Sequence, residues 1–175
     1  LDALDFREKA PAAATKTMYQ DENGEVISEM STLGHLAVGV PGSVAGMWEL
    51  HQKYGTIHWT ELIQPAINLA FEGHFITADE AETLNEKQPD FKQANTWEIW
   101  AVKESGWNEN DYIKQPQLAA TLSFIRDFGK GGFYDGIVAD QIYKEMIRGG
   151  GLITKQDLLD YEAKWRDPII TYYKE

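Results

Sequence analysis

Residues 5–11, with the sequence DFREKAP, contain the side chains of this chain best suited to binding a ligand. Apolar and acidic residues alternate from Leu1 up to this segment, which is typical of a β-strand, and strand ends often present functional side chains from a rigid scaffold. Arg7 adds a planar, permanently charged fork that can bind a carboxylate through two hydrogen bonds. An ordinary surface ion pair of Arg7 with Glu8 or Asp5 accounts for the same residues, and composition alone favours this simpler interpretation.

Other reactive residue types lack the spacing that chemistry requires. The four histidines are His35, His51, His58 and His74. No two of them have the spacing of a helical two-ligand motif, so no metal site is expected. The chain has no cysteine and no Gly-x-Ser-x-Gly sequence, which excludes thiolate catalysis and gives serine-hydrolase chemistry no motif. The glycine-rich segment 39–46 lacks the Gly-Lys-Ser/Thr of a phosphate-binding loop, and we interpret it as a strand-to-helix turn in which Gly46 allows close packing.

Net charge and hydropathy exclude two further classes of partner. The 16 Lys and Arg residues against 28 Asp and Glu residues give a net charge of −12, which repels phosphate backbones, so nucleic acid is not expected as a partner. No apolar run approaches the roughly 18 residues of a membrane helix, so no membrane span is expected in this segment. The apolar content of 43% is ample for the core of a globular chain.

Apolar residues at three- and four-residue spacing predict the helices that position these side chains. Their expected ranges are 44–54, 60–72, 77–86, 116–128, 137–148 and 154–161. Thr60 is the predicted N-cap of the second helix. Thr77 and Thr154 each precede an acidic residue by three positions, which is the capping-box arrangement. The glycine-rich run 129–132 is expected to break the fourth helix before Phe133.

The remaining segments are assigned to strands and irregular structure. We expect strands at 1–7 and at 168–173, which pair either with each other or with chain outside this sequence. Residues 88–114, which include Trp97, are polar and aromatic and are expected to be irregular, with room for one short strand. The predicted fold is α+β, mostly helical with strands at its edges. We expect a single partial domain over residues 1–175 with no internal linker, because both ends have strand patterns already in progress.

Several segments resemble the large subunit of γ-glutamyltranspeptidases. Residues 5–11 are similar to the D-x-R-E-x-A-P segment of that family. Further similar segments follow in the family's order; they are HLAVGVPGSVAG at 35–46, YG at 54–55, QPAINLA at 64–70, FYDG at 133–136 and GGLITKQDL at 150–158. Because these landmarks recur in order over nearly the whole chain, the chain is identified as the central part of such a large subunit.

The resemblance implies a fold, a reaction and two binding residues. The implied fold is the four-layer αββα sandwich of N-terminal-nucleophile hydrolases, in which a precursor cleaves itself into a large and a small subunit. The implied nucleophile is a threonine at the new N-terminus of the small subunit, so this chain contains no catalytic residue and is expected to be inactive alone. The family arginine that binds the α-carboxylate of the γ-glutamyl donor falls on Arg7, and a supporting glutamate falls on Glu8. No metal and no cofactor are implied.

The same resemblance implies partners and leaves alternatives open. The implied partners are the small subunit of the same precursor, a γ-glutamyl donor such as glutathione, and an amino acid, peptide or water acceptor, in the periplasm or outside the cell. Residues 88–114 match the family poorly, so their loops are free to set a narrower substrate choice. β-Lactam side-chain acylases and poly-γ-glutamate-processing enzymes share the scaffold, and their activities remain alternatives. A non-enzymatic helical module that docks a basic partner on its acidic surface is a further alternative.

Overall fold

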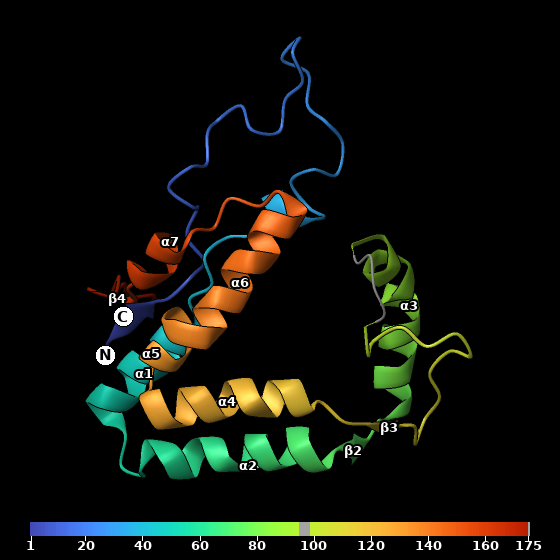
Figure 1. Ribbon diagram of the computed structural model, residues 1–175. Helices are drawn as coiled ribbons and strands as arrows, with labels where there is room; N and C mark the ends of the chain where they lie inside the picture. Colours follow the sequence, from blue (N-terminus) through green and yellow to red (C-terminus); the bar gives the residue numbers. More distant parts are fainter. Residues whose placement is uncertain (95–98, 175) are drawn as a thin grey trace.

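The computed structural model describes residues 1–94 and 99–174 of the chain. The α-helices are α1 (Ser43–Tyr54), α2 (Trp59–Glu72), α3 (Ala78–Ala94), α4 (Pro116–Phe128), α5 (Gly131–Tyr134), α6 (Gly136–Gly149) and α7 (Lys155–Leu159), and a 3₁₀ helix, η1, spans His35–Ala37. The short strands are β1 (Ala3–Asp5), β2 (His74–Phe75), β3 (Tyr112–Ile113) and β4 (Lys164–Arg166). Figure 1 shows α6 and α7 beside β1 and β4, the pair α2 and α4 below them, and α3 on a separate arm.

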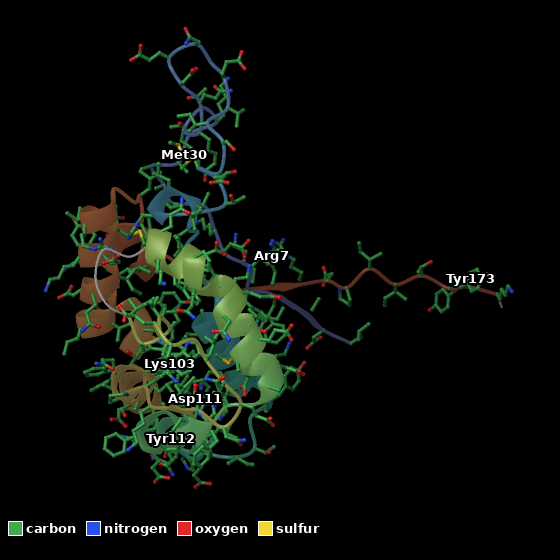
Figure 2. The ribbon with its side chains drawn as sticks, turned by 90° about the vertical axis from the view of Figure 1, so that its right-hand side faces the viewer. Arg7, Met30, Lys103, Asp111, Tyr112 and Tyr173 are labelled. Atoms are coloured by element: carbon green, nitrogen blue, oxygen red, sulfur yellow. The ribbon has the colours of Figure 1, made fainter. Side chains whose placement is uncertain are left out.

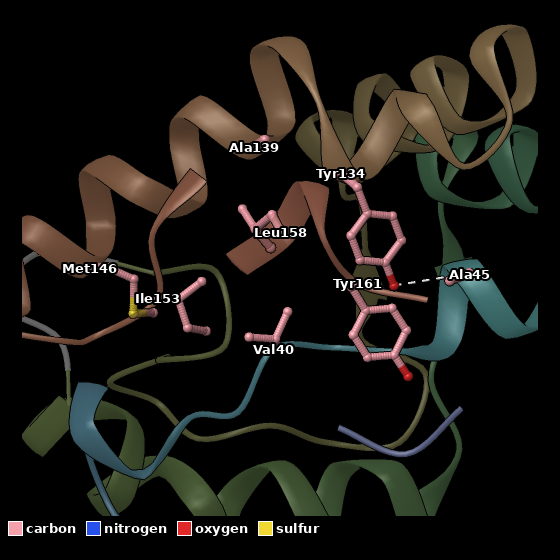
Figure 3. Close-up of a cluster of buried hydrophobic side chains, with 8 residues drawn as sticks. All are labelled: Val40, Ala45, Tyr134, Ala139, Met146, Ile153, Leu158 and Tyr161. Carbon is pink, nitrogen blue, oxygen red and sulfur yellow. Dashed lines mark hydrogen bonds between the residues drawn. The ribbon is translucent and has the colours of Figure 1, made fainter. Parts of the chain in front are cut away.

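The main core lies where the last three helices meet the glycine-rich segment. Its buried residues are Val40, Ala45, Tyr134, Ala139, Met146, Ile153, Leu158 and Tyr161. Leu158 is fully buried in this cluster. It lies on the short helix α7, which begins with a capping box: the Thr154 side chain accepts from the Asp157 backbone, and the Asp157 carboxylate accepts from the Thr154 backbone. Figure 3 shows these side chains between α6, α7 and the chain that leads into α1. This core therefore supports the segment that precedes α1.

Helices α2 and α4 form a second packed unit. They lie side by side (Figure 1), and the Trp59 indole N–H donates to the Ile125 carbonyl over 2.8 Å. Trp59 also makes an edge contact with Trp48 of α1, with ring centroids 5.1 Å apart. Arg126 reaches from α4 to the Gln64 side chain of α2 over 2.6 Å. These contacts attach the pair to α1.

The arm that carries α3 has a small core of its own. Ile76, Ala81 and Ile113 are buried together, and β2 pairs antiparallel with β3, with His74 opposite Ile113. The Asn85 side chain makes two hydrogen bonds to the Trp107 backbone: Nδ2 donates to the Trp107 carbonyl over 2.8 Å, and Oδ1 accepts from the Trp107 N–H over 2.8 Å. These contacts fold the loop back onto α3.

The terminal strand predictions are half confirmed. β1 lies within the predicted strand 1–7 and pairs antiparallel with β4, with Ala3 opposite Arg166. The predicted strand at 168–173 is wrong, because the strand lies at Lys164–Arg166 and residues 167–174 form neither helix nor strand. Pro168 lacks a backbone N–H, and the segment has no pairing strand within the described residues. Figure 2 shows it extending from the body to Tyr173.

The helix predictions hold in position but not always in length. The capping box at Thr77 is confirmed, with Thr77 Oγ1 accepting from the Glu80 backbone over 3.3 Å and Thr77 N donating to Glu80 Oε2 over 2.8 Å. The predicted end near residue 86 is wrong, because α3 continues through Pro89 to Ala94 and therefore enters the range 88–114 that was expected to be irregular. Trp97 lies outside the described residues.

Two smaller departures concern helix boundaries. α2 begins at Trp59 with His58 before it, so Thr60 is not the N-cap. The glycine-rich run 129–132 ends α4 as predicted, but the chain re-enters a helix at Gly131 because Tyr134 of α5 is anchored in the main core. The short strand allowed for within 88–114 is β3. Within residues 1–94 and 99–174, no helix combines the length and apolarity needed to cross a membrane.

Candidate substrate-binding site

A cavity of about 540 Å³ lies between the end of β1 and the start of α1. Its walls come from two segments, and the lining residues are Leu4, Asp5, Phe6, Arg7, Glu8, Gly39, Pro41, Gly42 and Ser43. Lys9 and Val40 hold the segments together, with Lys9 N donating to Val40 O over 3.1 Å and Val40 N donating to Lys9 O over 2.8 Å. The charged segment singled out from the sequence therefore faces the glycine-rich turn across one cavity.

Arg7 and Glu8 lie next to each other at the rim of this cavity. Arg7 Nη2 donates to Glu8 Oε1 over 2.9 Å, and the two side chains are 81% and 57% exposed. The hydrogen bond from Arg7 lowers the pKa of Glu8, and the same bond raises the pKa of Arg7. The surface ion pair considered from the sequence is thus formed with Glu8. Among the residues that the structure describes, none accepts a hydrogen bond from Nε or Nη1 of Arg7, so part of its fork is available to a ligand.

Asp5 ties the end of β1 to β4. Its Oδ2 accepts a hydrogen bond from Arg166 Nε over 2.7 Å and lies 2.6 Å from Arg166 Nη2 in the same ion pair. The hydrogen bond from Arg166 is the main cause that lowers the pKa of Asp5. Oδ1 of the same carboxylate accepts from the Arg7 backbone N–H over 3.3 Å. Asp5 therefore has a structural partner of its own and supports the turn of the chain at Arg7.

Two glycines let the opposite wall approach the strand end closely. A Cβ atom at Gly46, in the first turn of α1, would overlap the Phe6 ring, and a Cβ atom at Gly42 would overlap the Phe6 carbonyl oxygen and the Tyr161 hydroxyl. The interpretation of Gly46 as a close-packing position is confirmed. The expected strand before the turn is not formed: the segment leads from η1 through an isolated β-bridge of Val40 with Lys9 into α1, and it forms one wall of the cavity.

Two tyrosines beneath the cavity were not recognised from the sequence. Tyr161 is 3% exposed and its hydroxyl donates to the Arg7 carbonyl over 2.7 Å. The Tyr134 hydroxyl donates to the Pro41 carbonyl over 2.6 Å and accepts from the Ala45 N–H over 3.3 Å. A buried tyrosine hydroxyl normally has a hydrogen-bond partner, so the sequence could have indicated that these two tyrosines bind polar groups. It could not indicate which groups.

The histidines lie in separate places. His35 Nε2 is hydrogen-bonded to Glu145 Oε1 at 2.7 Å, and His51 Nε2 to the Ile57 carbonyl at 2.8 Å. The pKa of Glu145 is lowered to about 2, first by the hydrogen bond from Arg148 and then by His35. Within residues 1–94 and 99–174, no three His, Asp or Glu side chains form a group that could hold a metal ion.

The arrangement is suited to binding an anion rather than to making or breaking bonds. It offers one permanent cation with unused donors, next to two carboxylates that already have basic partners. Ser43 lines the cavity, but in the described part of the chain no histidine or lysine is hydrogen-bonded to its hydroxyl. A ligand with a carboxylate of its own fits the remaining donors of Arg7, because a guanidinium binds a carboxylate through parallel hydrogen bonds.

Comparison with known proteins gives one consistent family. A family model described as Gamma-glutamyltranspeptidase matches residues 1–175. The chain is 43% identical over 175 residues to the glutathione hydrolase proenzyme of Pseudomonas aeruginosa, an alignment that covers 95% of this chain and 29% of that protein. The chain therefore spans less than a third of the length of this curated relative.

Solved structures agree with the sequence comparison. The γ-glutamyltranspeptidase of Helicobacter pylori is similar with a TM-score of 0.92 and 44% identity, over 99% of this chain and 50% of that chain. A cephalosporin acylase from Bacillus halodurans has a TM-score of 0.82 and 27% identity, over 99% of this chain and 33% of that chain. The expected fold class is confirmed: the chain is a mostly helical α+β part of the N-terminal-nucleophile hydrolase fold.

Proposed function

Because this chain belongs to the γ-glutamyltranspeptidase family, we propose that the whole protein transfers or hydrolyses γ-glutamyl groups of glutathione and related donors. A threonine outside this chain, at the N-terminus of the small subunit of the same precursor, attacks the γ-carbonyl carbon. The amide bond breaks, and the leaving amine departs with a proton. Water or the amine of an amino acid or peptide then attacks the acyl-threonine ester, and the threonine hydroxyl regains its proton.

Arg7 has the role of binding the α-carboxylate of the donor in this proposal. The observation that carries it is the exposed guanidinium at the rim of the 540 Å³ cavity, with Nη2 on Glu8 and the other donors unused by the described residues. Glu8 supports Arg7 through the 2.9 Å hydrogen bond that orients the guanidinium. A permanent cation suits this task because a γ-glutamyl donor keeps its α-carboxylate ionised at neutral pH.

The test compares the full-length wild-type precursor with its Arg7→Ala variant. After self-cleavage has been checked on a gel, hydrolysis of a γ-glutamyl anilide is measured over a range of substrate concentrations. Arg7→Ala is expected to raise KM about ten- to a hundredfold, because a charge-assisted pair with the donor is lost. Lys87→Ala is the control and should leave KM unchanged, since Lys87 also forms an exposed ion pair, with Asp90 over 3.5 Å, but lies on α3. Equal kinetics of Arg7→Ala and wild type would refute the assignment.

A β-lactam side-chain acylase is the second candidate, favoured by the similarity to the Bacillus halodurans cephalosporin acylase. Such an enzyme has no need of a cation for a donor α-carboxylate. The wild-type protein is therefore assayed with a side-chain-bearing cephalosporin beside the γ-glutamyl anilide. Faster release of the cephalosporin side chain, with Arg7→Ala as active as wild type, would favour the acylase. A poly-γ-glutamate substrate in the same assay tests the remaining enzymatic alternative, poly-γ-glutamate processing. The comparisons give no support to a non-enzymatic module.

We further propose that residues 1–175 form one partial domain of the large subunit and that the protein is exported to the periplasm or the cell exterior. Both proposals rest on the family, and the name of the relative as a proenzyme supports a self-cleaved precursor with a small-subunit partner. Cell fractionation with an antibody against this chain tests the location, and recovery of the protein with cytoplasmic markers would contradict it.

A further inference from the structure

The Arg7 side chain has little packing to fix its direction. It is 81% exposed, and its one side-chain partner, Glu8, is itself 57% exposed. A flexible arginine loses rotamer freedom when it binds a ligand, and this loss reduces affinity. The loss is smaller when the backbone that carries the side chain is already fixed in the position that the ligand requires. The position of the guanidinium therefore depends on how firmly the backbone at Arg7 is held.

The backbone around Arg7 is held at three points. The Asp5 carboxylate accepts from the Arg7 N–H on one side, and Lys9 exchanges two backbone hydrogen bonds with Val40 on the other. Between them, the Tyr161 hydroxyl donates to the Arg7 carbonyl over 2.7 Å from a position 154 residues later in the chain. The Arg7–Asp5 bond, at 3.3 Å, is exposed, whereas the Tyr161 bond, at 2.7 Å, is part-buried, so the Tyr161 bond is the shorter and better shielded of the two at Arg7.

Tyr161 is itself rigidly placed. Its ring stacks on Tyr134, with centroids 5.5 Å apart and planes 7° from parallel, and Figure 3 shows both rings beside Ala45 at the start of α1. The Tyr134 hydroxyl is fixed in turn on the Pro41 carbonyl over 2.6 Å. Burial raises the pKa of Tyr161, so its hydroxyl keeps the proton that it donates at neutral pH. The stacked pair thus connects the main core to both walls of the cavity.

We propose that Tyr161 is a positioning residue for donor binding, whose hydroxyl fixes the Arg7 backbone and thereby aims the guanidinium at the donor carboxylate. This inference rests on the proposed function. The Tyr161 hydroxyl lies close to both Phe6 at the strand end and Gly42 in the turn, because a Cβ atom at Gly42 would overlap both this hydroxyl and the Phe6 carbonyl. A shift of the hydroxyl therefore moves the Arg7 carbonyl and the cavity wall together.

The test is a double-mutant cycle on the full-length, self-cleaved protein. Tyr161→Phe removes only the hydroxyl, and the cycle combines it with Arg7→Ala, using kcat/KM for a γ-glutamyl anilide because this ratio stays measurable when KM is high. Tyr112→Phe is the matched control: its hydroxyl also donates to a backbone carbonyl, that of Glu72, over 2.5 Å, but it lies on the α3 arm far from Arg7. Figure 2 shows this separation. Melting temperatures confirm that each variant is folded in the assay.

Tyr161→Phe is expected to raise KM about three- to tenfold with kcat nearly unchanged, and to have no further effect once Arg7 is alanine. Tyr112→Phe is expected to leave KM unchanged. An equal loss from Tyr161→Phe in both backgrounds would overturn the inference, because the hydroxyl would then act independently of Arg7. A normal KM for Tyr161→Phe beside a raised KM for Arg7→Ala would overturn the inference alone, whereas a normal KM for Arg7→Ala would overturn the proposed function with it.

A second variant keeps the inference testable if Tyr161→Phe does not fold or cleave itself. Gly42→Ala keeps the Tyr161 side chain, but its added Cβ atom would overlap both the Tyr161 hydroxyl and the Phe6 carbonyl oxygen, so the contact between phenol and strand end must shift. The same cycle with Arg7→Ala is then measured. A loss of kcat/KM that disappears in the Arg7→Ala background supports the inference, and a loss that persists there contradicts it.

Discussion

Replacing Tyr134 with phenylalanine isolates the hydrogen bonds that fix the glycine-rich turn to the core. Tyr134 is 2% exposed, and its hydroxyl both donates to the Pro41 carbonyl over 2.6 Å and accepts from the Ala45 N–H over 3.3 Å. Ala45 is fully buried in the first turn of α1, where backbone N–H groups have no partner within the helix. The substitution therefore leaves a buried donor and a carbonyl without this partner while the ring remains.

The expected loss of stability follows from these two bonds. Each net hydrogen bond contributes about 1 kcal/mol, and groups left unpaired in a core cost more, so Tyr134→Phe should lower the free energy of unfolding by about 2 kcal/mol. For a unit of 175 residues that corresponds to a fall in Tm of about 4–8 °C, and the fall is smaller in the longer full-length protein because its entropy of unfolding is larger. Burial raises the pKa of Tyr134 from 10.0 to about 12 in the folded protein. Its contribution is therefore complete below pH 10 and is lost as the pH rises from 10 towards 12.

The assay is thermal unfolding of the full-length protein, wild type and Tyr134→Phe, from pH 7 to pH 11. The difference in Tm should be largest at neutral pH and shrink above pH 10. Tyr112→Phe is the control, because its ring is 48% exposed and its loss of a hydroxyl is expected to change Tm little. A Tm of Tyr134→Phe equal to that of wild type at pH 7 would refute the view that this hydroxyl holds the turn.

Three further changes test other contacts. Glu145→Gln should lower the Tm at pH 7, with a difference from wild type that vanishes as the pH falls from about 4.5 towards 2, because Arg148 holds the folded pKa of Glu145 at about 2. Gly46→Ala should lower kcat/KM for a γ-glutamyl anilide about tenfold in the proposed enzyme, because the added methyl group displaces Phe6 beside the cavity. Trp59→Phe should lower the free energy of unfolding by about 1–3 kcal/mol in denaturant titrations, because α2 loses its indole hydrogen bond to α4.

Matched variants control these measurements. Gly131→Ala adds the same methyl group where no atom lies within 4 Å, so its kcat/KM should equal that of wild type. Trp100→Phe changes an indole that is 51% exposed and should affect stability less than Trp59→Phe. A Glu145→Gln difference that is constant from pH 7 to pH 2 would contradict the ion-pair explanation. Normal kcat/KM in Gly46→Ala would show that the Phe6 position does not matter for the donor.

Local sequence was enough to predict where the site residues lie. Alternation of residues up to Arg7 placed it at a strand end, and β1 does end at Asp5. The capping boxes at Thr77 and Thr154 were also predicted correctly from the sequence, since each is made within four consecutive residues. The role of Arg7 stays a prediction, because its most direct contact, with the neighbouring Glu8, is compatible with an ordinary surface pair.

Contacts between distant segments were decided only by the tertiary structure. β4 lies at Lys164–Arg166 rather than after Pro168 because strand position depends on the partner, here β1, and β propensity alone does not specify the partner. The contact of Tyr161 with the Arg7 carbonyl joins residues 154 positions apart, and no local pattern encodes it. The sequence by itself thus determined the approximate positions of most helices, the capping boxes at Thr77 and Thr154 and the position of the charged strand end, which depend on neighbouring residues. The packed core determined which buried hydroxyl supports that strand end, because hydrogen-bond partners of a buried group are set by whichever segment packs against it.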